Sequence, residues 1–335
     1  MTTGKPRVYV IGTGGSISCV GDSRIDLLNY NYADKHLTIE EMVGRIPEAA
    51  QIAEIRSEQF LNVYGGDVAP SQWLALARRV NQIFREDAQA AGIVVTHGTS
   101  TLEETAYFLN LAVKSSRPLV ITGAMRPPTG LGTDADINLY DAIRVAASPE
   151  AAGKGALVVL NSQIQAARDA VKTSTSRVET FKSGELGFLG YADSDGKVVF
   201  LRAPVRAHTA ASEFDVDRIV ALPRVDIAYA YSGVDGVAVK ALTAAGCVGL
   251  VGAGLGSGSA PRAFLDALRE ARESGVCVVM SSQSGHGRVM AKRAFTERGF
   301  AVGDSLAPKK IRILLMLALA QKRSTEEIQR MILTY

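Results

Sequence analysis

The sequence predicts an α/β protein with two domains: a larger N-terminal domain with a wound, mostly parallel sheet and a β-hairpin, and a smaller C-terminal domain with a parallel sheet. Three observations predict this fold. Short runs rich in Val and Ile alternate with helical patterns, as in wound sheets whose strands are buried on both faces. The turn sequence Ser194-Asp195-Gly196-Lys197 separates two extended runs and predicts the hairpin. The alternation starts afresh at Val225 after a stretch with little periodicity.

Seven segments are expected to be buried strands, because each is short, apolar and unbroken by polar residues. They are Arg7–Ile11, Gly92–Thr96, Pro118–Thr122, Ala156–Leu160, Ile227–Tyr231, Val248–Val251 and Val276–Met280. Five segments have helical periodicity, namely Ser71–Arg85, Leu102–Val113, Leu139–Ala147, Pro261–Ser274 and Pro308–Gln321. Ser71 is the expected N-cap of the first helix, and Ser100-Thr101-Leu102-Glu103 has the pattern of a capping box before the second. The predicted domains are residues 1–205 and 224–335, joined by a linker over 206–223.

Composition excludes several classes of function. The 335 residues carry 37 Lys and Arg against 34 Asp and Glu, and no segment concentrates basic residues as binders of nucleic acid or anionic membranes do. Three cysteines without a CxxC pattern or zinc spacing predict neither a disulfide framework nor a metal site. No apolar run approaches the roughly 18 residues of a membrane span, and the first residues lack the features of a signal peptide. We therefore expect a cytoplasmic protein that contacts neither nucleic acid nor membrane.

Glycine-rich sequences follow the predicted strands, where parallel sheets place their ligands. Neither Gly12–Ser16 nor Gly252–Gly258 fits the GxGxxG pattern of dinucleotide sites, and no Walker lysine follows either segment. The other interpretation is a hydroxyl nucleophile, Thr13, held among glycines at a strand end. A threonine hydroxyl needs a base or a proton relay, and Thr99 with Lys172 is a candidate relay.

Four segments give the chain a specific resemblance to the bacterial asparaginase/glutaminase family. They are Ile11–Ile17, Val95–Thr99 with Leu102–Leu109, Gly123–Pro127, and Val171–Thr173 with Thr180–Ser183. Their order and spacing match the family, and Asn138-Leu139-Tyr140 and Pro308–Leu319 extend the match over nearly the whole chain. The resemblance implies a two-domain asparaginase-like fold and an amidohydrolase.

The resemblance also implies roles for individual residues. The nucleophile falls on Thr13, and the flap tyrosine that assists it falls on Tyr32, with Tyr30 as a competing assignment. Thr99 and Lys172 serve proton transfer, and the Thr99 N–H helps to hold the oxyanion. The Ala124 carbonyl receives the substrate amide nitrogen. No metal or organic cofactor is implied, and the expected assembly is a homotetramer, a dimer of close dimers in which a neighbouring subunit completes each site.

The chain differs from the family at the residues that bind the amino-acid substrate. A Ser-Gln pair that binds the α-carboxylate and α-amino groups is replaced by Gly65 and Gly66, and the aspartate that holds the ammonium is Ser100. The neighbouring subunit's glutamate falls near Lys292. A buried ammonium without its partner costs several kcal/mol. The departures therefore predict a small-molecule amide substrate without a free α-amino group: an ω-amide, an N-substituted amide or a lactam, with Lys292 meeting an extra carboxylate.

Other interpretations stay open at this point. One alternative is a conventional L-asparaginase or glutaminase that binds its amino acid through other residues. Another is a non-catalytic small-molecule sensor on the same scaffold. A subunit of a tRNA-dependent amidotransferase is disfavoured by the lack of a basic face. His97 is expected to be structural rather than a base, Cys19 to be packing, and Arg126 and Asp134 to tie loops together.

Overall fold

The computed structural model describes residues 4–30 and 35–335. The chain divides into two compact units, one ending at Ser212 and the other starting at Glu213. Within the described ranges, no helix is long and apolar enough to cross a membrane. The predicted linker over 206–223 contains two 3₁₀ helices, η5 (Thr209–Ala211) and η6 (Val216–Arg218), and the predicted domain boundaries stay a prediction.

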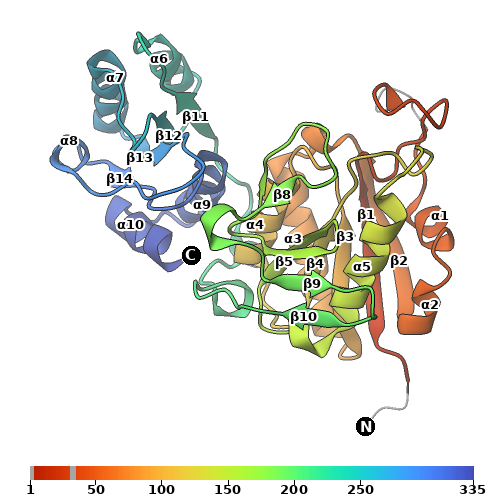
Figure 1. Ribbon diagram of the computed structural model, residues 1–335. Coiled ribbons are helices and arrows are strands. Elements are labelled where there is room, and N and C mark those ends of the chain that lie inside the picture. Colours follow the sequence, from red (N-terminus) through yellow and green to blue (C-terminus); the bar gives the residue numbers. More distant parts are fainter. Residues whose placement is uncertain (1–3, 31–34) are drawn as a thin grey trace. The chain divides into compact units, whose positions relative to one another are not determined.

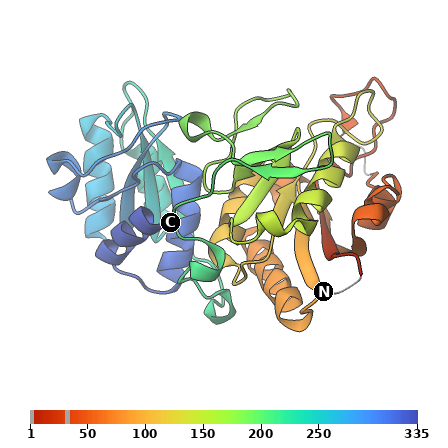
Figure 2. The same ribbon diagram turned by 60° about the horizontal axis from the view of Figure 1, so that its bottom comes forward.

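The first unit is built on an eight-stranded sheet in the order β10-β9-β6-β5-β4-β3-β1-β2 (Figures 1 and 2). The strands from β5 to β2 in this order pair in parallel, whereas β6, β9 and β10 add to them by antiparallel pairing. The strands are β1 Arg7–Gly14, β2 Glu54–Val63, β3 Ala90–Thr96, β4 Leu119–Thr122, β5 Ala156–Leu160, β6 Gln163–Ala166, β9 Gly190–Ala192 and β10 Val198–Phe200. The last two form the predicted hairpin, which is thereby confirmed.

Helices cover both faces of this sheet. One core cluster joins Val8 and Val10 of β1 to α1, α2 and α5, while α3 and α4 pack against the strands from the other side. Ile11, next to Val10, is also fully buried, so β1 is covered on both faces. The helices are α1 Ile39–Gly44, α2 Ala49–Ile52, α3 Pro70–Glu86, α4 Leu102–Ala112 and α5 Ala135–Ala147, and short 3₁₀ helices are η2 Gly65–Asp67, η3 Pro149–Ala151 and η4 Gly184–Leu186.

The first unit differs from the sequence prediction at β2 and at the start of α3, among other places. β2 is not among the predicted strands, because it lies at the sheet edge, is half buried and carries many polar residues. The prediction of Ser71 as an N-cap is wrong: α3 begins at Pro70, and Ala69 is the N-cap. Proline suits the first helical position, since its missing N–H would have no intrahelical partner there.

The second unit has a four-stranded parallel sheet in the order β11-β12-β13-β14. A core cluster joins this sheet to α6, α7 and α8, and α9 contacts β11, β12 and β13. The elements are β11 Val225–Tyr229, α6 Val237–Ala244, β12 Gly249–Gly254, α7 Arg262–Glu273, β13 Cys277–Ser282, α8 Arg293–Thr296, β14 Ala301–Val302, α9 Pro308–Ala320 and α10 Thr325–Thr334. Both units therefore confirm the predicted α/β class.

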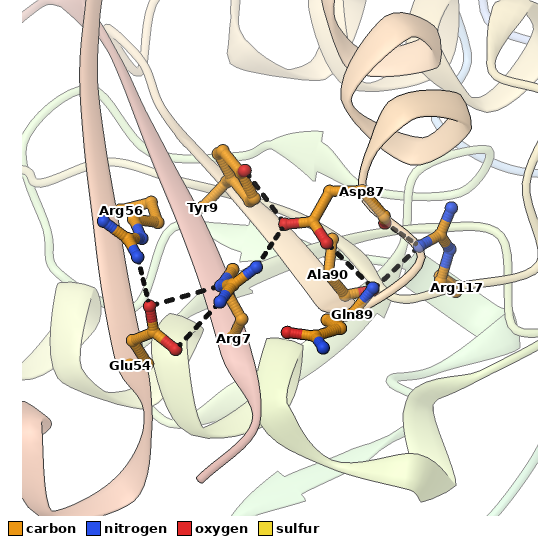
Figure 3. Close-up of polar contacts among 8 residues, drawn as sticks. All are labelled: Arg7, Tyr9, Glu54, Arg56, Asp87, Gln89, Ala90 and Arg117. Carbon is orange, nitrogen blue, oxygen red and sulfur yellow. Dashed lines mark hydrogen bonds and ion pairs between the residues drawn. The ribbon is translucent and has the colours of Figure 1, made fainter. Parts of the chain in front are cut away.

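A polar network ties the amino-terminal ends of the strands in the first unit (Figure 3). Arg7 at the start of β1 donates to Glu54 at the start of β2 and to Asp87 after α3, at 2.9 Å for Asp87. Tyr9 donates to the same Asp87 carboxylate at 3.0 Å, and Arg117 donates to the backbone carbonyl of Asp87 at 2.8 Å. The hydrogen bond from Arg7 holds the pKa of Asp87 below its ordinary value. This network anchors the end of the sheet opposite the glycine-rich turns.

Candidate active site

The site begins where adjacent parallel strands end. β1, β3 and β4 are neighbours in the sheet, so the segments that follow them lie along one edge. The segment after β2 joins them, because Val63 at the end of β2 pairs with Gly14 at the end of β1. The predicted nucleophile Thr13 lies in the last residues of β1, Thr99 follows β3, and Gly65 and Gly66 follow β2.

Thr13 lies near the carboxyl end of β1 and is buried. Its hydroxyl donates to the Thr96 carbonyl at 2.6 Å, which fixes the side chain against the end of β3. The chain then turns sharply through Gly14 and Gly15, both at positive φ. A Cβ on Gly15 would overlap the backbone of Gly98, so the turns after β1 and β3 are in direct backbone contact. Only glycine permits this approach.

Thr99 and Lys172 meet, as the predicted relay requires. The Lys172 Nζ donates to Thr99 Oγ1 at 2.9 Å, although 73 residues separate the two positions. Thr99 is buried at the turn after β3. Lys172 ends β7 (Val171–Lys172), which forms a small antiparallel hairpin with β8 (Phe181–Lys182). The Lys172 backbone N–H donates to Glu103 Oε2 at 2.9 Å. This arrangement can carry a proton between a lysine amine and a threonine hydroxyl.

Gly65 and Gly66 lie in η2, after β2. A Cβ on Gly65 would lie 2.7 Å from Gly98 Cα, and a Cβ on Gly66 would lie 3.0 Å from the Tyr64 ring. The backbone at 65 therefore touches the turn that carries Thr99, and the Tyr64 ring lies beside Gly66. Tyr64 is 45% exposed. The loop thus offers a bare backbone and one aromatic ring where the resemblance places a Ser-Gln pair.

The predicted capping box at Ser100 is wrong. The N-cap of α4 is Thr101, and it makes no side-chain cap hydrogen bond. The Thr101 hydroxyl instead donates to the Gly65 carbonyl, and Glu103 accepts from Lys172. Ser100 is exposed beside Thr99. Thr101 and Glu103, which a capping box would have paired locally, thus bond to the loop after β2 and to β7 instead.

The Ala124 carbonyl belongs to the turn after β4, and Ala124 is buried. Asp134 holds this turn by accepting from the Met125 and Arg126 N–H groups, each at 2.9 Å. Asn138 donates to the Gly123 carbonyl at 3.0 Å. Asp134 therefore ties a loop, as predicted.

His97 has a structural environment. Its Nδ1 lies 2.9 Å from the Gly98 carbonyl, and its Nε2 lies 2.8 Å from Thr105 Oγ1. Because a carbonyl only accepts, Nδ1 carries the proton and donates. The indole N–H of Trp73 donates to Thr105 Oγ1 at 2.8 Å, so the Thr105 hydroxyl can donate to Nε2. Burial lowers the pKa of His97 to about 4. These bonds occupy both ring nitrogens of the neutral imidazole, so His97 is poorly placed to be a base.

Three further residues named by the sequence analysis are Tyr32, Tyr30 and Cys19. Tyr32 falls outside the described residues. Tyr30 is buried, and its hydroxyl donates to the Met125 carbonyl at 3.4 Å. Cys19 is buried and donates to the Gly15 carbonyl at 3.3 Å, and burial raises its pKa to about 11. Cys19 therefore packs beneath the turn after β1 as a neutral thiol.

Lys292 belongs to the second unit, where it is the N-cap of α8. Its Nζ lies 3.2 Å from Ser259 Oγ and 4.6 Å from the centroid of the Phe295 ring. The side chain is thus folded back onto hydroxyl and aromatic groups of its own unit.

Sequence reasoning missed Glu103 and Tyr64 as residues of the site. The sequence pattern assigned Glu103 to a capping box, so its contact with Lys172 was not predicted. Tyr64 precedes the two glycines and carried no motif. Over residues 4–30 and 35–335, no group of three or more His, Cys, Asp or Glu side chains is arranged to hold a metal ion.

Family models and curated proteins match nearly the whole chain. The model of the family described as "Asparaginase, N-terminal" matches residues 7–206, and that of "Glutaminase/Asparaginase C-terminal domain" matches residues 224–332. L-asparaginase 2 of Bacillus subtilis is 41% identical over 324 residues, which cover 97% of this chain and 85% of that protein. The glutaminase-asparaginase of Pseudomonas fluorescens is 40% identical, with 98% and 90% covered.

Two further relatives differ in the location that their names give. A protein of Haemophilus influenzae named "Probable L-asparaginase periplasmic" is 39% identical, over 97% of this chain and 92% of its own. The crystal structure of a probable cytoplasmic L-asparaginase from Campylobacter jejuni has a TM-score of 0.94 and 40% identity, and the match covers 99% of this chain and all of that one.

Proposed function

Since the chain belongs to the asparaginase family of amidohydrolases, we propose that it hydrolyses a carboxamide C–N bond through Thr13, on a substrate that lacks a free α-amino group. The substrate is an ω-amide of a dicarboxylic acid, an N-substituted amide or a lactam. One observation carries the substrate assignment: Gly65 packs against Gly98 so closely that no side chain fits there without moving the backbone.

The proposed reaction has two steps. Thr13 Oγ1 bonds to the amide carbonyl carbon and its proton passes to a base, while the C–N bond breaks and the leaving nitrogen gains a proton. Water then cleaves the Thr13 ester and releases the acid. The bond from Thr13 to the Thr96 carbonyl orients the nucleophile at 2.6 Å. The bond between Lys172 and Thr99 at 2.9 Å supports their role in moving these protons. The Thr99 N–H helps to hold the oxyanion, and Tyr32 acts as the flap tyrosine.

The residue types at three positions of the first unit support the same substrate assignment. The resemblance places a Ser-Gln pair at Gly65 and Gly66 and an aspartate at Ser100, and none of those side chains is present. Ser100 is exposed and neutral beside Thr99. An ammonium held in this place would lack the carboxylate that offsets its loss of hydration. The Ala124 carbonyl receives the amide nitrogen, and Tyr64 gives the loop an aromatic surface suited to a bulkier substituent.

Two alternatives remain. The names of the Bacillus and Pseudomonas relatives favour a conventional L-asparaginase or glutaminase that releases L-aspartate and ammonia. A non-catalytic sensor of a small molecule would keep the scaffold but not turn over. The pairing of Lys172 with Thr99 argues against the sensor, because binding alone needs no proton relay.

The assembly and location complete the proposal. The protein forms a homotetramer, a dimer of close dimers, in which Lys292 of a neighbouring subunit meets an extra carboxylate of the substrate. Sedimentation equilibrium tests this assembly, and a monomer that is fully active would contradict it. A cytoplasmic location accords with the name of the Campylobacter protein, and fractionation of cells tests it.

The decisive experiment compares ammonia release from L-asparagine and from succinamate, which differ only in the α-amino group. We expect succinamate to have the higher kcat/KM. The variant Ser100→Asp should shift the ratio toward L-asparagine by about ten- to a hundredfold, since a charge-assisted hydrogen bond contributes about 1.5–3 kcal/mol. A clear preference for L-asparagine in the wild type would favour the conventional enzyme. Loss of all turnover in Thr13→Ala excludes the sensor, whereas a wild type without turnover on any amide supports it.

A further inference from the structure

Glu103 contacts the backbone of Lys172, the residue whose side chain reaches Thr99. Its Oε2 accepts the Lys172 backbone N–H at 2.9 Å, and the Lys172 Nζ donates to Thr99 Oγ1 at the same distance. Glu103 is only 4% exposed. A buried carboxylate is retained in proteins when it is hydrogen-bonded, and here one of its bonds goes to the backbone of the proposed proton-transfer lysine.

Thr99 and Glu103 belong to one short stretch of chain. They are four residues apart, and α4 begins between them at Leu102. The Thr101 N–H donates to the Gly98 carbonyl, and the Thr105 N–H donates to the Thr101 carbonyl. The first turn of a helix also favours a negative charge, because its free N–H groups point that way. The Thr99 hydroxyl and the Glu103 carboxylate are thus held by one hydrogen-bonded stretch, which runs from the turn after β3 into the first turn of α4.

The lysine, in contrast, comes from a small element. β7 has two residues and pairs with β8, which also has two. A two-stranded hairpin of this length is marginal by itself in water. The bond from Lys172 to Glu103 spans 69 residues and joins this hairpin to the start of α4. Because this hydrogen bond is made by the Lys172 backbone N–H, it fixes the position from which the Lys172 side chain extends.

We propose that Glu103 is a positioning residue: by accepting the Lys172 N–H, its carboxylate sets the distance between the Lys172 amine and the Thr99 hydroxyl. The proposal rests on the proposed function for its kinetic consequence, because Lys172 and Thr99 must act in turnover for their spacing to matter. Its structural consequence, the position of Lys172, does not depend on the substrate.

The kinetic test compares Glu103→Ala, Glu103→Gln and Glu103→Asp, with Glu104→Ala as the matched control in the same turn. Glu103→Ala should lower kcat at least tenfold and change KM by less than twofold. Glu103→Gln keeps an acceptor oxygen in the same place and should restore kcat to within threefold of the wild type. Glu104→Ala should have wild-type kinetics. If Glu103→Ala does not fold by circular dichroism, Glu103→Asp, whose carboxylate is one methylene shorter, should fold and lose at least threefold in kcat.

A crystal structure of each variant provides the readout that is independent of substrate. We expect the distance from Lys172 Nζ to Thr99 Oγ1 to exceed 3.5 Å in Glu103→Ala or Glu103→Asp (about the limit of a hydrogen bond) and to remain near the wild-type value in Glu103→Gln. An unchanged distance in the shortened variants overturns the proposal, as does a Glu103→Gln enzyme that folds but is as slow as Glu103→Ala. If the wild type hydrolyses no amide, the proposed function fails, while the distances still decide the role of Glu103.

Discussion

The packing of Gly65 against Gly98 predicts a measurable cost for a single methyl group. In Gly65→Ala, the new Cβ would lie 2.7 Å from Gly98 Cα, whereas ordinary contact begins at 3.4 Å. The two turns must therefore separate by 3.4 − 2.7 = 0.7 Å. Overpacking of this kind costs about 1–3 kcal/mol. Because Gly98 precedes Thr99 and a displacement of about 1 Å in a catalytic geometry costs about a hundredfold, kcat should fall at least tenfold.

The neighbouring glycine provides the control. In Gly66→Ala, the new Cβ meets the edge of the Tyr64 ring at 3.0 Å, and an exposed ring can turn away. We expect less than about 1 kcal/mol of destabilisation and a smaller fall in kcat than in Gly65→Ala. Urea unfolding, followed by the fluorescence of the single tryptophan, Trp73, measures the difference. Equal stability and equal kcat for the two variants would refute the steric argument.

Three further outcomes are expected. Arg7 lowers the pKa of Asp87, so the stabilisation from the Asp87 carboxylate is present above the ordinary pKa of 3.8 and is lost as the pH falls below it. The Tm of Arg7→Leu should therefore fall less than the wild-type Tm between pH 5 and pH 3, with a difference of about a few degrees. His97→Leu should lower Tm, since unsatisfied buried partners cost about 1–3 kcal/mol, yet keep kcat within about tenfold; a complete loss of activity in a folded variant would make His97 catalytic. Asp134→Ala should loosen the turn that presents the Ala124 carbonyl and raise KM about tenfold, and unchanged steady-state kinetics would contradict that role.

Much of the fold follows from patterns that are local in sequence. The strands around Val94 and Val158 are buried on both faces, so their apolar runs are continuous and easy to recognise. β2 escaped prediction because an edge strand exposes polar side chains and has no continuous apolar run. The start of α3 was displaced because the N-cap, Ala69, has no capping side chain.

The candidate site is less local, and its prediction depended on the resemblance. Neither composition nor periodicity relates Lys172 to Thr99, since the contact spans 73 residues and is created by the fold. The motif at Ser100 suggested a cap, but long-range bonds of Thr101 and Glu103 prevailed over the local pattern. Contacts of this kind become visible only when the coordinates of both partners are known.

The contact between Gly65 and Gly98 also couples the loop after β2 to the turn that carries Thr99. A side chain at position 65 could be accommodated only if the backbone at Gly98 moved away. Such a variant would be strained before it gained any new contact with a ligand. Redesign of this edge of the site would therefore need paired changes in both turns rather than a single substitution at position 65.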